Sequence, residues 1–190
     1  AVPKGPSPPP DVIIVGAGIA GCSVAWHLAG HCRVLLLEQG GQPWAEATAQ
    51  SAGMVRNMVD DPVERVLVRR TQSFLQEPGP DFIRPPSQRT GAVISLARDP
   101  FALHDCVAHL RANGVRVEDC DRPWEVAPMM AGAPPMKSWF LPDEHLADPA
   151  ALGEGFVRGA LRKGAHLMLE TRVTGLHVEG GVVRGVHTTE

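Results

Sequence analysis

The segment Asp11–Glu38 constrains the fold of this chain more than any other stretch. It opens with a short run of β-branched residues, Val12–Val15, that ends at a glycine, which is typical of a buried parallel strand. A helical stretch follows, and a second apolar run, Val34–Leu37, is closed by the acidic Glu38. Strand, glycine-rich turn, helix and strand in this order predict a βαβ core that binds a dinucleotide.

Three glycines in G-x-G-x-x-G spacing, Gly16, Gly18 and Gly21, join the first strand to the helix. Gly16 allows a sharp turn, Gly18 lets a pyrophosphate approach the backbone, and Gly21 lets the helix pack close to the strand. The free N–H groups of the first helical turn favour phosphate. Glu38 can accept hydrogen bonds from both ribose hydroxyls and would repel a 2′-phosphate. The binding residues expected in this segment are Gly16, Gly18, Ile19, Ala20, Gly21, Glu38 and Gln39.

The composition is that of an ordinary globular chain. Its 190 residues fit one domain, or one domain and a piece of another, and 44% of them are hydrophobic. A net charge of −3 gives no reason to expect a nucleic acid or an anionic membrane as partner. Residues 1–10 are Pro-rich and lack the apolar core of a secretion signal, so we expect an extended lead-in and a cytoplasmic or mitochondrial matrix protein.

The cysteines and histidines give little support for a metal site. The four cysteines have no C-x-x-C spacing, and Cys22 is expected to be a small buried residue of the first helix. His104 and His109 are five residues apart, which is the wrong step for one helical face, and the other histidines are scattered. We therefore expect no metal ion. No G-x-S-x-G motif supports a serine hydrolase.

A second candidate segment, Thr48–Met54, is rich in small residues. Small residues permit a flat ligand to approach the backbone, and the hydroxyls of Thr48 and Ser51 can hold phosphate oxygens. Taken alone, the segment is better explained as the start of an Ala-rich helix capped by Thr48. The candidate binding residues of this segment are Thr48, Ala49, Ser51, Ala52, Gly53 and Met54.

Gly16–Glu38, followed by T-A-Q-S-A-G-M-V-R at Thr48–Arg56, resembles the FAD-dependent amine and amino-acid oxidoreductases, which include D-amino acid oxidase, glycine oxidase, sarcosine oxidase and dimethylglycine dehydrogenase. The resemblance continues in the same order through Arg89–Leu96, Leu141–Pro149 and residues 164–188. It implies that the glycine motif and Glu38 hold the ADP half of FAD, that the small-residue segment runs beside the diphosphate, ribityl chain and flavin, and that the backbone of Val173 contacts adenine.

Two departures from the family pattern carry information. Gln50 stands where some relatives have the histidine that attaches flavin covalently, so the resemblance implies non-covalent FAD. The sequence stops at Glu190, whereas the family continues with most of its substrate domain, so the chain resembles the first half of such an enzyme. No catalytic residue is assigned, and whether this chain alone is an enzyme stays open. Arg56 is interpreted as a surface residue, with a place near the flavin or the substrate carboxylate as the alternative.

The resemblance implies a mixed substrate domain between the two parts of the nucleotide-binding core, and the remaining patterns fit this arrangement. Prolines or Asp-Pro pairs start three helices, and the first of these, at Asp61-Pro62, has an apolar face that includes Val63, Val66 and Leu67. About twenty residues after Glu118 are expected to form a loop in which methionines fill gaps. The expected helices are 62–77, 99–112 and 149–163, with a short strand at 115–118 and a hairpin at 171–178 and 182–188. The family resemblance implies a further strand at 89–96.

These observations predict an α/β fold: a Rossmann-like FAD-binding βαβ core, residues 11–80 and 160–190, with a partial mixed α+β substrate domain, residues 81–159, inserted. The function that the resemblance implies is oxidation of the CH–NH group of an amine or amino acid by hydride transfer to flavin N5. The alternatives are a non-catalytic FAD- or nucleotide-binding module that needs a partner, and an NAD-dependent dehydrogenase. An incomplete sheet would expose apolar surface, so self-association or a partner subunit is expected.

Overall fold

The structure is a computed structural model that describes residues 8–59, 61–96, 100–134 and 136–189. They form two compact units: unit 1 is Ala1–Ser51, Pro78–Pro86 and Asp148–Glu190, and unit 2 is Ala52–Glu77 and Ser87–Ala147. The boundaries of these units differ from the expected domain limits at residues 52–77, 81–86 and 148–159, and the assignment of a FAD-binding and a substrate domain stays a prediction. Residues 1–7 of the expected lead-in, and Asp99 at the expected start of a helix, lie outside the described residues.

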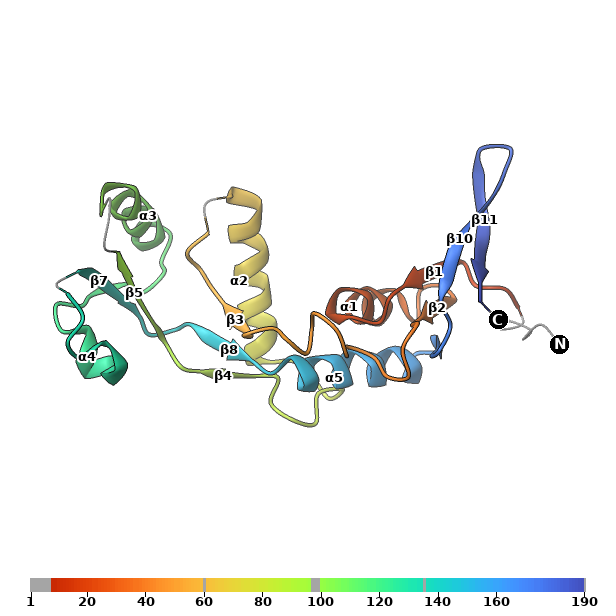
Figure 1. Cartoon of the computed structure of the whole chain (residues 1–190), viewed down its shortest axis with the longest axis horizontal. Helices are drawn as coiled ribbons and strands as arrows, with labels where there is room; N and C mark the ends of the chain where they lie inside the picture. Colours follow the sequence, from red (N-terminus) through yellow and green to blue (C-terminus); the bar gives the residue numbers. More distant parts are fainter. Residues whose placement is uncertain (1–7, 60, 97–99, 135, 190) are drawn as a thin grey trace. The chain divides into compact units, whose positions relative to one another are not determined.

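Unit 1 contains the parallel sheet that the two apolar runs predict. Strands β1 (Val12–Val15), β2 (Val34–Leu37) and β9 (His166–Met168) lie in the order β1-β2-β9. Figure 1 labels the first two of these strands, β1 and β2. Val12 pairs with Val34, and Leu36 pairs with Leu167. Every residue of β2 is at most 6% exposed, because this strand has a neighbour on each side. The βαβ start of the fold is therefore confirmed.

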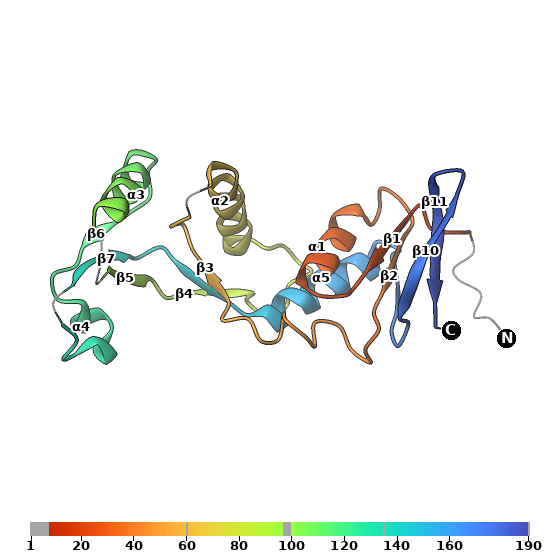
Figure 2. The ribbon, with the colours of Figure 1, turned by 45° about the horizontal axis from the view of Figure 1, so that its top comes forward.

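Two helices of unit 1 lie side by side, α1 (Ile19–Leu28) and α5 (Pro149–Arg162), as Figure 2 shows. Small residues allow this close approach: a Cβ at Gly159 would overlap the indole of Trp26. Helix α5 begins where the sequence predicts, with the Asp148 side chain accepting a hydrogen bond from Ala151 N at 3.0 Å, and it stops before Gly164, whose φ is +94°. Cys22 of α1 is fully buried, as expected.

The C-terminal strands form an antiparallel hairpin. Strand β10 (Val173–Glu179) pairs with β11 (Val182–Thr188), and Glu179 lies opposite Val182. Gly180 and Gly181 both have positive φ, which the two-residue turn between the strands requires. The predicted hairpin is confirmed, with its first strand starting two residues later than expected.

Unit 2 contains two small antiparallel sheets and helix α2 (Pro62–Gln76). One sheet has the order β3-β8-β4, from strands β3 (Met54–Val55), β8 (His145–Ala147) and β4 (Ser87–Arg89). The other has the order β5-β7-β6, from strands β5 (Ala92–Leu96), β7 (Lys137–Leu141) and β6 (Glu118–Asp119). Helix α3 (Pro100–Ala112), the short helix α4 (Pro123–Val126) and the 3₁₀ turn η1 (Pro128–Met130) complete the unit.

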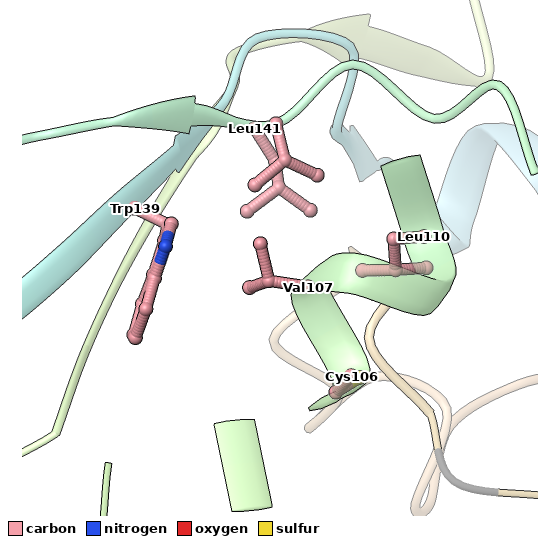
Figure 3. Close-up of a cluster of buried hydrophobic side chains, with 6 residues drawn as sticks. Cys106, Val107, Leu110, Trp139 and Leu141 are labelled. Atoms are coloured by element: carbon pink, nitrogen blue, oxygen red, sulfur yellow. The ribbon is translucent and has the colours of Figure 1, made fainter. Parts of the chain in front are cut away.

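The hydrophobic core of unit 2 lies between α3 and strand β7. Trp139 and Leu141 of β7 face Val107 and Leu110 of α3, and Cys106 borders the same cluster (Figure 3). Trp139, Val107, Leu110 and Leu141 are each at most 2% exposed. Val107 and Leu110 therefore lie on the face of α3 that packs against β7.

Several features of unit 2 differ from the sequence-based expectations. The expected strand 89–96 is two strands, β4 and β5, because the chain turns at Gly91, whose φ is +68°. The expected strand 115–118 is limited to residues 118–119, which pair with β7, while Val117 packs into the core. The segment expected as a loop after Glu118 contains α4, η1 and the start of β7. The predicted apolar face of α2 exists, but Val63, Val66 and Leu67 are each more than half exposed.

Candidate dinucleotide-binding site

A cavity of about 360 Å³ lies in unit 1 at the carboxyl ends of β1 and β2. Ligands of open parallel sheets bind at this end of the strands. Six of the residues predicted from the sequence line it: Gly16, Gly18, Glu38, Gln39, Thr48 and Val173. The other lining residues are Val15, Leu37, Trp44, Ala45, Glu46, Ala47 and Thr171.

The glycine turn forms one wall of the cavity. Gly16 has a φ of +94°, and its N–H donates to the carbonyl of Leu37 at 2.7 Å, which ties the end of β1 to the end of β2. A Cβ at Gly21 would overlap the carbonyl oxygen of Gly16. Helix α1 can therefore start close to the strand only because residue 21 has no side chain.

Thr48 completes the start of helix α1 from a distant part of the chain. Gly18 is the N-cap residue and has no side chain to cap the helix, but Thr48 Oγ1 accepts a hydrogen bond from Ile19 N at 3.0 Å. The hydroxyl proton of Thr48 is not used in this bond and can be donated to another group. Thr48 is 9% exposed and lines the cavity, so it adds a donor to the positive end of the helix dipole.

The carboxylate of Glu38 is held by two backbone N–H groups. Its Oε2 accepts from Ala17 N and its Oε1 from Gly40 N, each at 2.8 Å. A carboxylate has about four acceptor sites, so these two bonds leave capacity on both oxygens for hydroxyl donors. The backbone of Glu38 is fixed as well, because its N–H donates to Met168 O at 2.9 Å and its carbonyl accepts from Thr171 N at 2.8 Å.

Trp44 is a cavity residue that sequence reasoning missed. Its φ is +48°, and its N–H donates to the carbonyl of Ala17 at 2.8 Å, which closes the loop after Glu38 over the glycine turn. The indole lies against Gly153 of α5, where a Cβ would come within 2.6 Å of the ring. A tryptophan four positions before Thr48, in Trp44-Ala45-Glu46-Ala47, was the only signal in the sequence.

Cys22 borders this region but has no nucleophilic role. Burial, reinforced by the negative charge of Glu38, raises the pKa of its thiol to about 11, and the thiol donates to the carbonyl of Ala17 at 3.3 Å. A thiol with this pKa stays protonated at neutral pH. Cys22 therefore supports the packing of the glycine turn.

A family model described as FAD dependent oxidoreductase (DAO) matches residues 11–190 of the chain. The chain belongs to this DAO family of FAD-dependent oxidoreductases. A glycine oxidase of Bacillus licheniformis is 26% identical over 185 residues, which cover 92% of this chain and 49% of the relative. The chain spans about half the length of the curated relative that it matches.

Solved structures share the fold of the DAO-family chain. L-proline dehydrogenase from P. horikoshii matches with a TM-score of 0.83 at 20% identity, over 93% of this chain and 48% of that one. Glycine oxidase from Geobacillus kaustophilus matches with a TM-score of 0.81 at 21% identity, over 95% of this chain and 51% of that one. L-amino acid deaminase from Proteus vulgaris matches with a TM-score of 0.81 at 19% identity, over 98% of this chain and 46% of that one.

The cavity of this DAO-family chain fits the ADP half of FAD, the cofactor that the family name states. The glycine turn leaves the backbone open where a Cβ would fill the space, Thr48 has a donor to spare, and Glu38 has acceptors to spare. Ile19, Ala20 and Gly21 form the first turn of α1, and Ala49 and Ser51 follow Thr48 in unit 1. Ala52, Gly53 and Met54 belong to unit 2. The binding role of all these residues stays a prediction.

Metal ligands and membrane spans are both lacking in the described parts of the chain. No three His, Cys, Asp or Glu residues of these parts lie together as metal ligands would. None of the described helices is long and apolar enough to cross a membrane.

Proposed function

We propose that this chain contributes the FAD-binding part of an oxidoreductase that oxidises the CH–NH group of an amine or amino acid. The observation that carries the proposal is the convergence of the glycine turn, Thr48 and the Glu38 carboxylate on one cavity of a DAO-family chain. The names of relatives with the same fold, a glycine oxidase and an L-proline dehydrogenase, support a substrate with a carbon–nitrogen bond to oxidise.

The proposal gives each part of the site a role. The backbone at Gly16–Gly21 and the start of α1 receive the diphosphate, where N–H groups and the helix dipole offset negative charge. Thr48 donates its hydroxyl proton to a phosphate oxygen, and Glu38 accepts from the ribose hydroxyls. Val173 borders the adenine. When bound, the flavin accepts a hydride at N5, and the protein supplies orientation and hydrogen bonds around it.

Non-covalent binding is part of the proposal, because Gln50 has no nucleophilic side chain for a bond to the flavin. The experiment is a titration of the purified chain with FAD, followed by visible absorption and by quenching of flavin fluorescence. We expect saturable binding and complete release of FAD on heating. Flavin that stays with the denatured protein would contradict the non-covalent part, and a folded chain that takes up no FAD would contradict the proposal for this chain.

A Glu38→Gln variant tests the site itself. One of the two backbone donors, Ala17 N or Gly40 N, would then face an amide NH₂ group, and the ribose would lose a charged acceptor. We expect FAD to bind about tenfold more weakly or worse. Glu179→Gln on the exposed end of β10 is the matched control and should bind FAD as the wild type does.

A second candidate function is a FAD-binding part that is inactive until another chain completes it. The half-length match to the relatives favours this reading. Anaerobic addition of an amine or amino acid to the FAD-loaded chain separates the two candidates. Bleaching of the flavin absorption by the chain alone supports the enzyme, and stable yellow colour with every amine supports the binding part.

A further inference from the structure

A second cavity, of about 480 Å³, lies wholly within unit 2 and is lined by charged and apolar groups together. Strand β5 forms one wall, and Met54, Met58 and Cys106 add apolar surface. The charged residues that line it are Arg56 and Glu144. Both also line an adjoining cavity of about 260 Å³, so they stand at the junction of the two spaces.

Glu144 is a buried carboxylate with only one of its oxygens satisfied. The residue is 3% exposed. Its Oε1 accepts from Asn57 N at 2.8 Å and from Asn57 Nδ2 at 3.2 Å. Its Oε2 is buried and has no hydrogen-bond partner among the described residues. A buried acceptor without a partner is costly, and most such groups in proteins are satisfied.

The surroundings of Glu144 fix it in place. Its carbonyl accepts from Thr90 N at 3.1 Å and from Gly91 N at 3.0 Å, at the turn between β4 and β5. Burial raises the pKa of Glu144, and the hydrogen bonds from Asn57 and the charge of Arg56 oppose this effect. A cation with N–H donors at Oε2 would supply the missing hydrogen bond and a positive charge in direct contact with the carboxylate.

Arg56 carries the complementary charge. It is exposed, and it forms no ion pair and no side-chain hydrogen bond with any residue that the structure describes. A guanidinium in this state offers planar donors that match a carboxylate. The sequence alone favoured a surface role for Arg56, and its place beside Glu144 in one cavity is what changes that interpretation.

We propose that this cavity binds a small amino acid as a zwitterion, with its ammonium group on Glu144 Oε2, its carboxylate on Arg56, and its carbon skeleton against Met54, Met58 and Ile94. This assignment rests on the proposed function, because it names the side chains that would bind the amine. Met54 and Met58 are unbranched, so a change of their rotamers can open a path to the buried oxygen. The competing explanation is that Glu144 only supports the backbone of Asn57.

The test is calorimetric titration of the full chain with three small molecules of matched shape. L-Proline has both charged groups, cyclopentanecarboxylate lacks the ammonium, and pyrrolidine lacks the carboxylate. We expect L-proline to bind at least about tenfold more tightly than either analogue, because each analogue leaves one charged partner unused. No binding of L-proline to the folded chain, or equal binding of all three, would overturn the assignment.

Two variants and their controls locate the binding. Glu144→Gln keeps an acceptor for Asn57 but loses the charge, and Arg56→Gln changes an exposed side chain, so we expect the variant to fold. Each should weaken L-proline binding about tenfold or more, whereas the exposed controls Glu118→Gln and Arg69→Gln should not. If Arg56→Gln binds L-proline as the wild type does, the assignment is wrong, whether or not Glu144→Gln folds.

A FAD titration of the same sample separates this inference from the proposed function. FAD binding without L-proline binding refutes the amino-acid site and leaves the FAD-binding proposal standing. L-Proline binding without FAD binding refutes the latter for this chain and supports the site in unit 2. Weakened L-proline binding in Glu144→Gln with unchanged FAD binding is the result that supports both.

Discussion

Trp26 Nε1 donates a hydrogen bond to Asp81 Oδ2 at 2.9 Å, which joins helix α1 to the segment Pro78–Pro86. The other carboxylate oxygen, Oδ1, accepts from Arg162 Nε of α5 at 3.0 Å and forms an ion pair with the same guanidinium. Lys163 Nζ lies 4.0 Å from the centre of the Trp26 ring. Asp81 is 5% exposed, so three parts of unit 1 meet at one buried carboxylate.

Replacing Asp81 by Ala should destabilise the chain by about 2–3 kcal/mol, because the Trp26 N–H loses its acceptor and Arg162 loses its partner. The measurement is the free energy of unfolding from a urea titration. Asp11→Ala is the control: Asp11 pairs with Arg33 on the surface, where such a pair contributes about 1 kcal/mol or less. Equal losses in the two variants would contradict the special role of Asp81.

The stability of the chain should fall in acid, and Asp81 should account for part of the loss. Burial alone would raise the pKa of Asp81, but the hydrogen bonds from Trp26 and Arg162 outweigh it and hold the pKa below the ordinary 3.8. A carboxyl with a lowered folded-state pKa stabilises the fold above its unfolded-state pKa, and that contribution is lost as the pH falls through the folded-state pKa.

The check compares wild type and Asp81→Asn in urea titrations from about pH 7 down to about pH 3. The difference in free energy of unfolding between the two proteins should be largest at neutral pH. It should shrink below about pH 4, because the wild-type carboxyl then takes up a proton, first in the unfolded state and at lower pH in the folded state. A difference that does not change with pH would show that the charge of Asp81 contributes nothing to stability.

Gly21→Ala should prevent normal packing of α1 on β1, because the added Cβ would overlap the carbonyl of Gly16, and backbone atoms cannot yield cheaply. We expect a loss of about 2–3 kcal/mol in stability together with loss of FAD binding. Gly185→Ala in β11 is the matched control, since a Cβ there meets no atom within 4 Å. A Gly21→Ala chain with wild-type melting temperature and FAD affinity would contradict this account.

The sequence was sufficient where a local pattern determines the structure. The apolar runs at 12–15 and 34–37, the glycine spacing and the caps at Asp61 and Asp148 each act within a few residues, and the structure has the corresponding strands and helices. Asp61, for example, accepts from Val63 N at 2.7 Å and from Glu64 N at 3.0 Å, as a helix cap should.

Other features depend on contacts between distant residues, and no local pattern reveals them. Thr48 caps a helix that starts 29 positions earlier, and Glu144 lies 87 positions from Asn57. Strand β7 is a five-residue segment whose burial depends on helix α3, so its short sequence pattern could not be separated from a loop. The exposed face of α2 is the opposite case: the amphipathic pattern predicts a buried face, but the described residues provide nothing to bury it.

That exposed surface predicts self-association of the chain. Val63, Val66 and Leu67 of α2 are 67%, 51% and 54% exposed, and β1 has a strand neighbour on one side only within the described sheet. Apolar patches and open strand edges of this kind drive association in water. We expect the apparent mass measured by light scattering to rise with protein concentration, and Val63→Glu with Leu67→Glu to lower it. Arg69→Gln with Arg70→Gln, at two exposed positions of the same helix, makes the same change in net charge without adding to or removing the apolar face, and a monomeric wild type at all concentrations would contradict the prediction.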